Sequence, residues 1–158
     1  MRELTKAMEL WRISVHQTLS GEGGIYSDGR WNTIGQPIVY MAESSAGALL
    51  EVLVHLPLER DEIPDQYTLL RVVIPAGLAI SNLVPEKQGW ETQESLTRAI
   101  GDAWLASSET ALARVPSAIV PECWNYLLNP LHPDARKIQI ANATISPYDF
   151  RLLRVRDR

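Results

Sequence analysis

The segment from Gly29 to Glu51 constrains the fold most, because its residue pattern predicts a loop, a strand and a helix in direct succession. Gly29 and Gly35 bracket Arg30 in a loop where glycine permits close backbone approaches that a side chain would prevent. This is the arrangement that an anion-binding loop needs. Residues 37–43 follow a proline boundary and are rich in β-forming side chains, which predicts a short strand. A helix over 44–56, capped by Ser44 or Ser45, is expected next.

The predicted helix has an apolar stripe, and its one acidic residue lies away from that stripe. The stripe, at the spacing of a buried helix face, consists of Ala46, Leu49, Leu50 and Leu53. Glu51 falls on the opposite face, so taken alone it reads as a solvated charge. Arg30 taken alone reads as a loop arginine paired with a nearby acid such as Asp28. The alternative is that Arg30 and Glu51 belong to one binding site.

Length and composition indicate a single domain over residues 1–158, because a chain of this length that is 46% hydrophobic can bury a substantial core. A net charge of −4 and a pI near 5.4 argue against a general nucleic-acid or membrane surface, although a local basic pocket is compatible with them. Cys123 is the one cysteine, and no Cys/His spacing indicates a metal site. With no secretory leader and no run of 18 apolar residues, we expect the cytoplasm.

The rest of the chain predicts an α+β fold with a largely antiparallel sheet. A second helix is expected between 91 and 108, with Trp104 in its core-facing stripe. The other members of that stripe are Leu96, Ala99, Ile100 and Ala103. Further strands are expected at 10–15, 69–74, 111–121, 124–128, 137–141 and 150–155. Pro116 and Pro121 cannot donate to a ladder, so their strand is expected at an edge or a bulge. The glycines at 21, 23 and 24 lack the context of a Rossmann or P-loop motif, which excludes both.

Three polar residues outside the 29–51 segment have an ordinary interpretation. Arg12 alternates with Trp11 and Ile13 along the strand 10–15, and position alone favours a surface arginine. Ser117 lies between the two prolines without the features of a nucleophile, which favours a hydroxyl that satisfies the backbone. His132 precedes Pro133 and is most simply a turn residue, with a role in a site as the minority interpretation.

Six ordered blocks that span nearly the whole chain resemble the RES-domain proteins, the toxin partners of bacterial type II toxin–antitoxin pairs. The blocks are Trp11-Arg12-Ile13, Gly29-Arg30-Trp31-Asn32 with Gly35, Val39-Tyr40, Ala48-Leu49-Leu50-Glu51, Val115-Pro116-Ser117-Ala118 and Asn129-Pro130-Leu131-His132-Pro133. The domain name records a characteristic Arg, Glu and Ser, which the resemblance assigns to Arg30, Glu51 and Ser117.

The resemblance implies an ADP-ribosyltransferase-like α+β fold that binds NAD as its substrate, without a metal, and breaks the nicotinamide–ribose bond. Arg12 and Tyr40 match further pocket positions. In the wider ADP-ribosyltransferase pattern the catalytic carboxylate comes late, on a strand, whereas Glu51 comes early, on a predicted helix. The resemblance also implies a cognate antitoxin of the Xre helix-turn-helix type that covers the pocket, so this chain is not expected to bind DNA itself.

The chemistry of NAD suits these residues. The guanidinium groups of Arg12 and Arg30 can hold a pyrophosphate, and the Tyr40 ring can stack on the cationic nicotinamide. Glu51 can stabilise positive charge on the ribose, and Ser117 can bind either the ribose or the carboxamide. The acceptor of the ADP-ribosyl group stays open among water, phosphate and protein. A non-catalytic module that binds a nucleotide or peptide in the same pocket is the alternative hypothesis.

Overall fold

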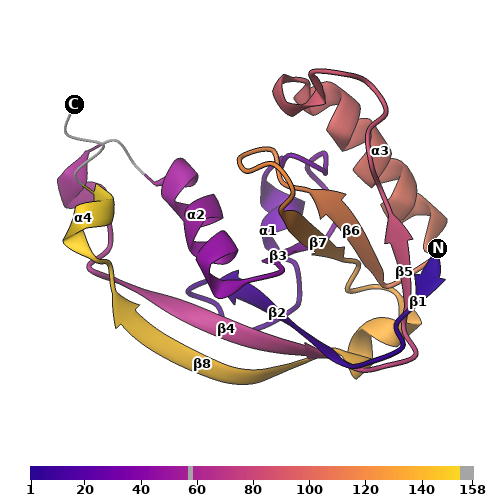
Figure 1. The fold of residues 1–158 in the computed structure, drawn as a ribbon, viewed down its shortest axis with the longest axis horizontal. Coiled ribbons are helices and arrows are strands. Elements are labelled where there is room, and N and C mark those ends of the chain that lie inside the picture. Colours follow the sequence, from indigo (N-terminus) through magenta and orange to yellow (C-terminus); the bar gives the residue numbers. More distant parts are fainter. Residues whose placement is uncertain (57–58, 154–158) are drawn as a thin grey trace.

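The computed structural model describes residues 1–56 and 59–153, which form one strongly curved sheet of eight strands with helices beside it (Figure 1). The strand order is β1-β5-β6-β7-β3-β2-β4-β8, and every neighbouring pair is antiparallel except β5 and β6. The strands are β1 (Arg2–Glu3), β2 (Met8–Ile13), β3 (Val39–Ala42), β4 (Gln66–Ile74), β5 (Ala79–Asn82), β6 (Leu112–Pro116), β7 (Trp124–Leu128) and β8 (Gln139–Pro147). The predicted α+β fold with a largely antiparallel sheet is confirmed.

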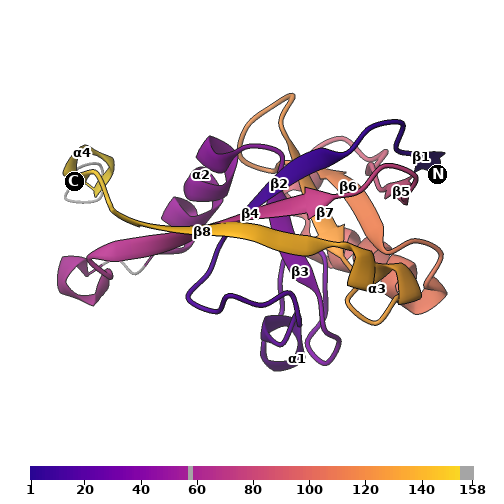
Figure 2. The same ribbon diagram turned by 90° about the horizontal axis from the view of Figure 1, so that it is seen from below.

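Two longer helices, α2 (Ser45–His55) and α3 (Glu94–Ser107), lie on the same face of the sheet. The short helical elements are α1 (Gly23–Tyr26), η1 (Arg60–Glu62), η2 (Trp90–Thr92), η3 (Pro133–Lys137) and α4 (Phe150–Leu153). Figure 2 shows β4 and β8 side by side, with α4 following the end of β8. No helix within the described part of the chain is long and apolar enough to cross a membrane.

Two apolar clusters lie on opposite faces of the sheet. Along β7, Tyr126 and Leu128 belong to the first cluster and Leu127 to the second, as the alternation of a strand requires. The first cluster is drawn mainly from strands, because the curvature of the sheet lets its two ends pack over this face (Figure 1). In the second cluster, Trp104 of α3 packs on β6 and β7, which confirms the prediction that Trp104 is core.

The sheet is weakest between β2 and β3. These strands pair at a single register position, Trp11 with Ala42, whereas β2 pairs with β4 over six consecutive positions from Met8 to Ile13. The two strands therefore diverge over most of their length. Helix α2, which begins shortly after β3, contacts both β2 and β3 and lies beside them (Figure 1).

The segment 29–51 has the predicted order of loop, strand and helix. Residues 39–42 form β3, and Ser44 caps α2 with its side-chain oxygen, which accepts a hydrogen bond from the backbone N–H of Gly47 at 2.9 Å. The α3 stripe is partly wrong, since Ala99 and Ala103 are exposed. The buried residues of α3 are Thr97, Gly101, Trp104 and Leu105.

Two predictions in the last third of the chain are wrong. Strand β6 lies inside the sheet, between β5 and β7, and tolerates Pro116 because that residue is its last and lies beyond the stretch that pairs with β5. Residues 150–153 form the helix α4 in place of a strand, and the remainder of the predicted strand, 154–155, lies outside the described residues. Strand β8 runs over 139–147 and is longer than the predicted 137–141.

Candidate functional site

A pocket of about 450 Å³ opens where β2 and β3 diverge beside α2. Four of the five predicted site residues line it: Arg12, Arg30, Tyr40 and Glu51. The fifth, Ser117, lies at its rim, because its neighbours Pro116 and Ala118 are lining residues. Residues that are 105 positions apart in the sequence therefore meet at one cavity.

Glu51 is a half-buried carboxylate held by one side chain of β7 and one from the turn after β6. Its Oε1 accepts a hydrogen bond from Asn125 Nδ2 at 2.7 Å and another from Ser117 Oγ at 3.2 Å. The interpretation of Glu51 as a solvated charge is therefore wrong. The two donors fix the orientation of the carboxylate beside the cavity, which a freely solvated surface charge would not show.

The predicted buried stripe of α2 is also wrong. The face that approaches the sheet carries Ala48, Glu51, Val52 and His55, which all line the pocket, and Ala48 is the one buried residue of the helix. Ala46 is exposed, and the three leucines of the predicted stripe are half-buried. The helix covers a cavity instead of a filled core, so its inward face did not need to be its most apolar one.

Ser117 uses every hydrogen-bonding position of its hydroxyl within the protein. Its Oγ accepts from the backbone N–H groups of Ile119 at 3.1 Å and Val120 at 3.2 Å, which closes the turn after β6. Its single hydrogen donates to Glu51. The expected backbone-satisfying hydroxyl is thus present, and it also orients the carboxylate.

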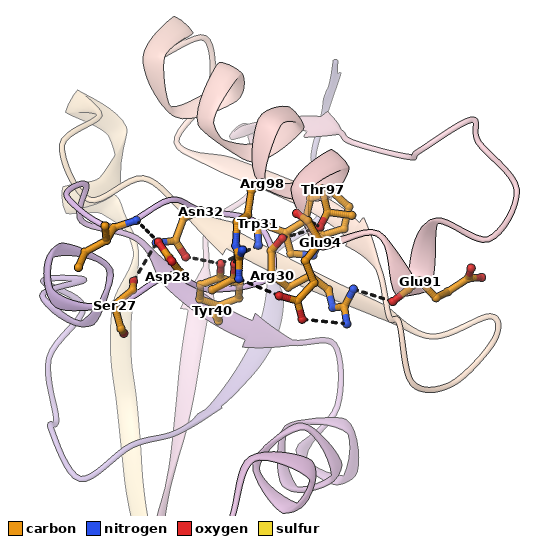
Figure 3. Close-up of polar contacts among 12 residues, drawn as sticks. Ser27, Asp28, Arg30, Trp31, Asn32, Tyr40, Glu91, Glu94, Thr97 and Arg98 are labelled. Atoms are coloured by element: carbon orange, nitrogen blue, oxygen red, sulfur yellow. Dashed lines mark hydrogen bonds and ion pairs between the residues drawn. The ribbon is translucent and has the colours of Figure 1, made fainter.

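Arg30 lies at the pocket, and its guanidinium contacts η2 and the first residue of α3 (Figure 3). Its Nη1 donates to the carbonyl oxygen of Glu91 at 2.9 Å, and its Nη2 lies 3.8 Å from Glu94 Oε1. The predicted partner, Asp28, instead accepts from the backbone N–H of Ile34 at 2.6 Å. The Arg30 side chain remains 30% exposed, so its contacts are of the exposed kind that a stronger anion can displace.

Arg12 is half-buried, which corrects its interpretation as a surface arginine. It shares β2 with Leu10, a core residue that is 1% exposed. Its Nη1 donates to the carbonyl oxygen of Tyr40 at 3.1 Å and so bridges the gap between β2 and β3. Its Nε is buried and has no hydrogen-bond partner among the described residues. Burial lowers the pKa of the Arg12 guanidinium, which nevertheless stays protonated.

The Tyr40 hydroxyl is committed to the loop that carries Arg30. It donates to Asn32 Oδ1 at 2.5 Å and accepts from the backbone N–H of Trp31 at 3.0 Å (Figure 3). Burial raises the pKa of Tyr40. A Cβ at Gly29 would overlap the Tyr40 hydroxyl and Asn32 Oδ1, so this loop needs glycine at that position. The hydroxyl thus holds the loop, and Tyr40 also lines the pocket.

Comparison with known protein families matches residues 9–152 to the RES domain. The chain belongs to the RES-domain family. It is 45% identical to Toxin Res of Pseudomonas putida (strain KT2440), over 87% of this chain and 96% of that protein. It is 38% identical to the Prs ADP-ribosylating toxin of Sphingobium sp. (strain YBL2), over 91% of this chain and 96% of that protein.

The fold of this RES domain resembles a chain from the crystal structure of the M. tuberculosis MbcT-MbcA toxin–antitoxin complex. The TM-score is 0.72 at 18% identity, and the match covers 99% of this chain and 92% of that one. At this identity the likeness shows the fold alone. Together these comparisons confirm the predicted membership of the RES-domain toxin family and the predicted α+β fold.

Asn125, the nearest donor to Glu51, was not among the site residues predicted from the sequence. A signal was present, since Asn125 is the one polar residue of the strand Trp-Asn-Tyr-Leu-Leu. His132 is the predicted turn residue: its Nδ1 accepts from the backbone N–H of Asp134 at 3.0 Å and caps η3. Among residues 1–56 and 59–153, no group of three or more His, Cys, Asp or Glu side chains is arranged to hold a metal ion.

Proposed function

We propose that residues 1–158 form a single RES domain that acts as the toxin of a type II toxin–antitoxin pair and consumes NAD by breaking its nicotinamide–ribose bond. The observation that carries this proposal is the state of Glu51, an oriented carboxylate in a pocket that two arginines and a tyrosine ring also line. The name of the Sphingobium relative, an ADP-ribosylating toxin, supports the same chemistry.

The two arginines suit the pyrophosphate. A guanidinium forms paired, charge-assisted hydrogen bonds to phosphate oxygens, and Arg30 needs only to exchange the Glu91 carbonyl and the distant Glu94 for them. Arg12 already carries the desolvation cost of burial with one donor unsatisfied. A protein keeps such a charge most readily where an anion makes use of it.

Tyr40 and Glu51 suit the reacting end of NAD. The Tyr40 ring offers a face for the cationic nicotinamide, worth roughly 0.5–2 kcal/mol. As the bond between the nicotinamide nitrogen and the ribose carbon breaks, the electron pair leaves with nicotinamide and positive charge develops on the ribose. A carboxylate that accepts a hydrogen bond from a ribose hydroxyl stabilises this charge more in the transition state than in the bound substrate.

The acceptor then supplies the electron pair that forms the new bond to the ribose carbon. Water gives ADP-ribose, phosphate gives ADP-ribose 1″-phosphate, and a protein side chain gives a modified protein. Mass spectrometry of the products, with phosphate and cell extract added in separate reactions, distinguishes the three. NAD that binds saturably and is recovered intact in every reaction would instead support a non-catalytic binding module.

Arg30→Ala is expected to weaken NAD binding by roughly 1.5–3 kcal/mol, the contribution of a hydrogen bond to a charged group. Binding is measured by calorimetry in a Glu51→Gln background, so that turnover does not consume the ligand. Arg71→Ala is the matched control, because Arg71 is a half-exposed arginine paired with Glu9 outside the pocket. Equal affinities for the two arginine variants would remove Arg30 from the binding site.

Expression of the chain without its antitoxin is expected to lower cellular NAD and arrest growth, because the cytoplasm where we place it holds the substrate. Coexpression with the neighbouring gene product, expected to be an Xre-type helix-turn-helix protein, should restore both. NAD is followed by enzymatic assay over the first hour of induction. A steady NAD level in cells that contain the folded chain alone would contradict the proposal.

A further inference from the structure

We infer that Asn125 is a positioning residue, which fixes Glu51 through one carboxylate oxygen and leaves the other oxygen to act on the ribose. This inference rests on the proposed function and deepens it. None of the six sequence blocks that carry the family resemblance includes Asn125. Its role follows from the geometry around the Glu51 carboxylate.

The two oxygens of that carboxylate have different surroundings. Oε1 accepts from both Asn125 at 2.7 Å and Ser117 at 3.2 Å, so its two lone pairs are engaged. Oε2 has no hydrogen-bond partner in the described part of the chain. Two donors that converge on one oxygen prevent the carboxylate from turning, and the unengaged oxygen is the one that remains available to a hydroxyl in the pocket.

Asn125 makes the shorter of the two hydrogen bonds to Oε1, and its backbone is the more firmly fixed of the two donors. It lies within β7, paired with Ala42 of β3 on one side and Val115 of β6 on the other, so its backbone is fixed from both directions. Ser117 lies in the turn after β6, where its hydroxyl also serves two backbone N–H groups. The amide of Asn125 therefore contributes more than Ser117 to the orientation of Glu51.

The residue before Asn125 is held as well. The backbone N–H of Trp124 donates to Glu43 Oε1 at 3.1 Å, and the Arg114 guanidinium lies 3.4 Å from the centre of the Trp124 ring. Helix α2 starts three residues after Ala42, the β3 partner of Asn125. The strand that carries Asn125 is paired with β3, and the helix that carries Glu51 starts from the end of β3, so both residues are positioned by the same strand.

A double-mutant cycle tests this role. Asn125→Ala is expected to lower kcat for nicotinamide release by roughly 10- to 100-fold, the rate equivalent of one hydrogen bond to a charged group, with KM changed by less than about threefold. In a Glu51→Ala background the same change should have no further effect on kcat, because no carboxylate is left to position. Asn142→Ala, on the exposed strand β8, is the control and should match the parent.

The outcomes are separable. If Asn125→Ala and Glu51→Ala lower kcat multiplicatively, or if KM rises while kcat is kept, Asn125 acts on its own and the inference is wrong. Asn125→Asp keeps the side-chain shape while it replaces the donor by a repelling carboxylate; it should lose at least as much kcat and gives the answer if the alanine variant does not fold. A parent chain that releases no nicotinamide would overturn the proposed function, and the inference with it.

Discussion

Glu51→Gln is expected to lower nicotinamide release by roughly 10²-fold or more, with little change in NAD affinity. Glutamine keeps the length and shape of the side chain and removes its negative charge. That charge matters most when positive charge develops on the ribose, which happens in the transition state and not in the bound substrate. The loss should therefore appear in kcat and leave the ground-state dissociation constant nearly unchanged.

The control for this variant is Glu109→Gln, which removes the charge of an exposed glutamate outside the pocket. Melting temperature, NAD affinity by calorimetry and turnover are measured on the same preparations. A small change in melting temperature is expected for Glu51→Gln, because the new amide must share its site with the Asn125 and Ser117 donors. Parental turnover in a normally folded Glu51→Gln protein would remove Glu51 from the mechanism.

Gly101→Ala is expected to destabilise the fold by about 3 kcal/mol, at the upper end of the overpacking range. A Cβ at this position in α3 would overlap the backbone carbonyl of Trp31, and a backbone carbonyl cannot move aside as a flexible side chain can. The helix must then lift away from the loop that carries Arg30. Thermal unfolding followed by circular dichroism measures the loss.

The matched control is Gly23→Ala, because a Cβ at Gly23 in α1 meets no atom within 4 Å. We expect its melting temperature to stay close to that of the parent. Gly101→Ala should also weaken NAD binding, since Thr97 Oγ1 of α3 donates to the Arg30 carbonyl at 2.5 Å and holds the loop against the helix. Equal melting temperatures for the two alanine variants would show that α3 does not pack tightly on this loop.

The local elements around the site could be predicted from the sequence because their causes are local. Ser44 caps α2 through a hydrogen bond within its own first turn, and β3 follows from a run of β-forming residues. That Arg30 and Glu51 lie near each other could also be predicted from the sequence, because they flank the same short strand. Their convergence with Arg12 and Ser117 was expected from the family resemblance, not from spacing.

The errors concern features that depend on distant parts of the chain. The inward face of α2 is set by a cavity between β2 and β3, which no periodicity within the helix reports. The place of β6 inside the sheet depends on β5, which pairs with it in parallel. Asn125 could not be identified as a site residue without knowing that β7 pairs with β3, since that pairing brings its amide to Glu51.

The proposed reaction in this pocket is cleavage of the bond between nicotinamide and ribose. The most direct test incubates the purified chain with NAD and quantifies nicotinamide, intact NAD and the ADP-ribosyl product by mass spectrometry. We predict one nicotinamide released for each NAD lost, with the pyrophosphate unbroken in the product. NAD that is recovered intact, or that is cleaved at the pyrophosphate into two mononucleotides, would show that the pocket does not catalyse this reaction.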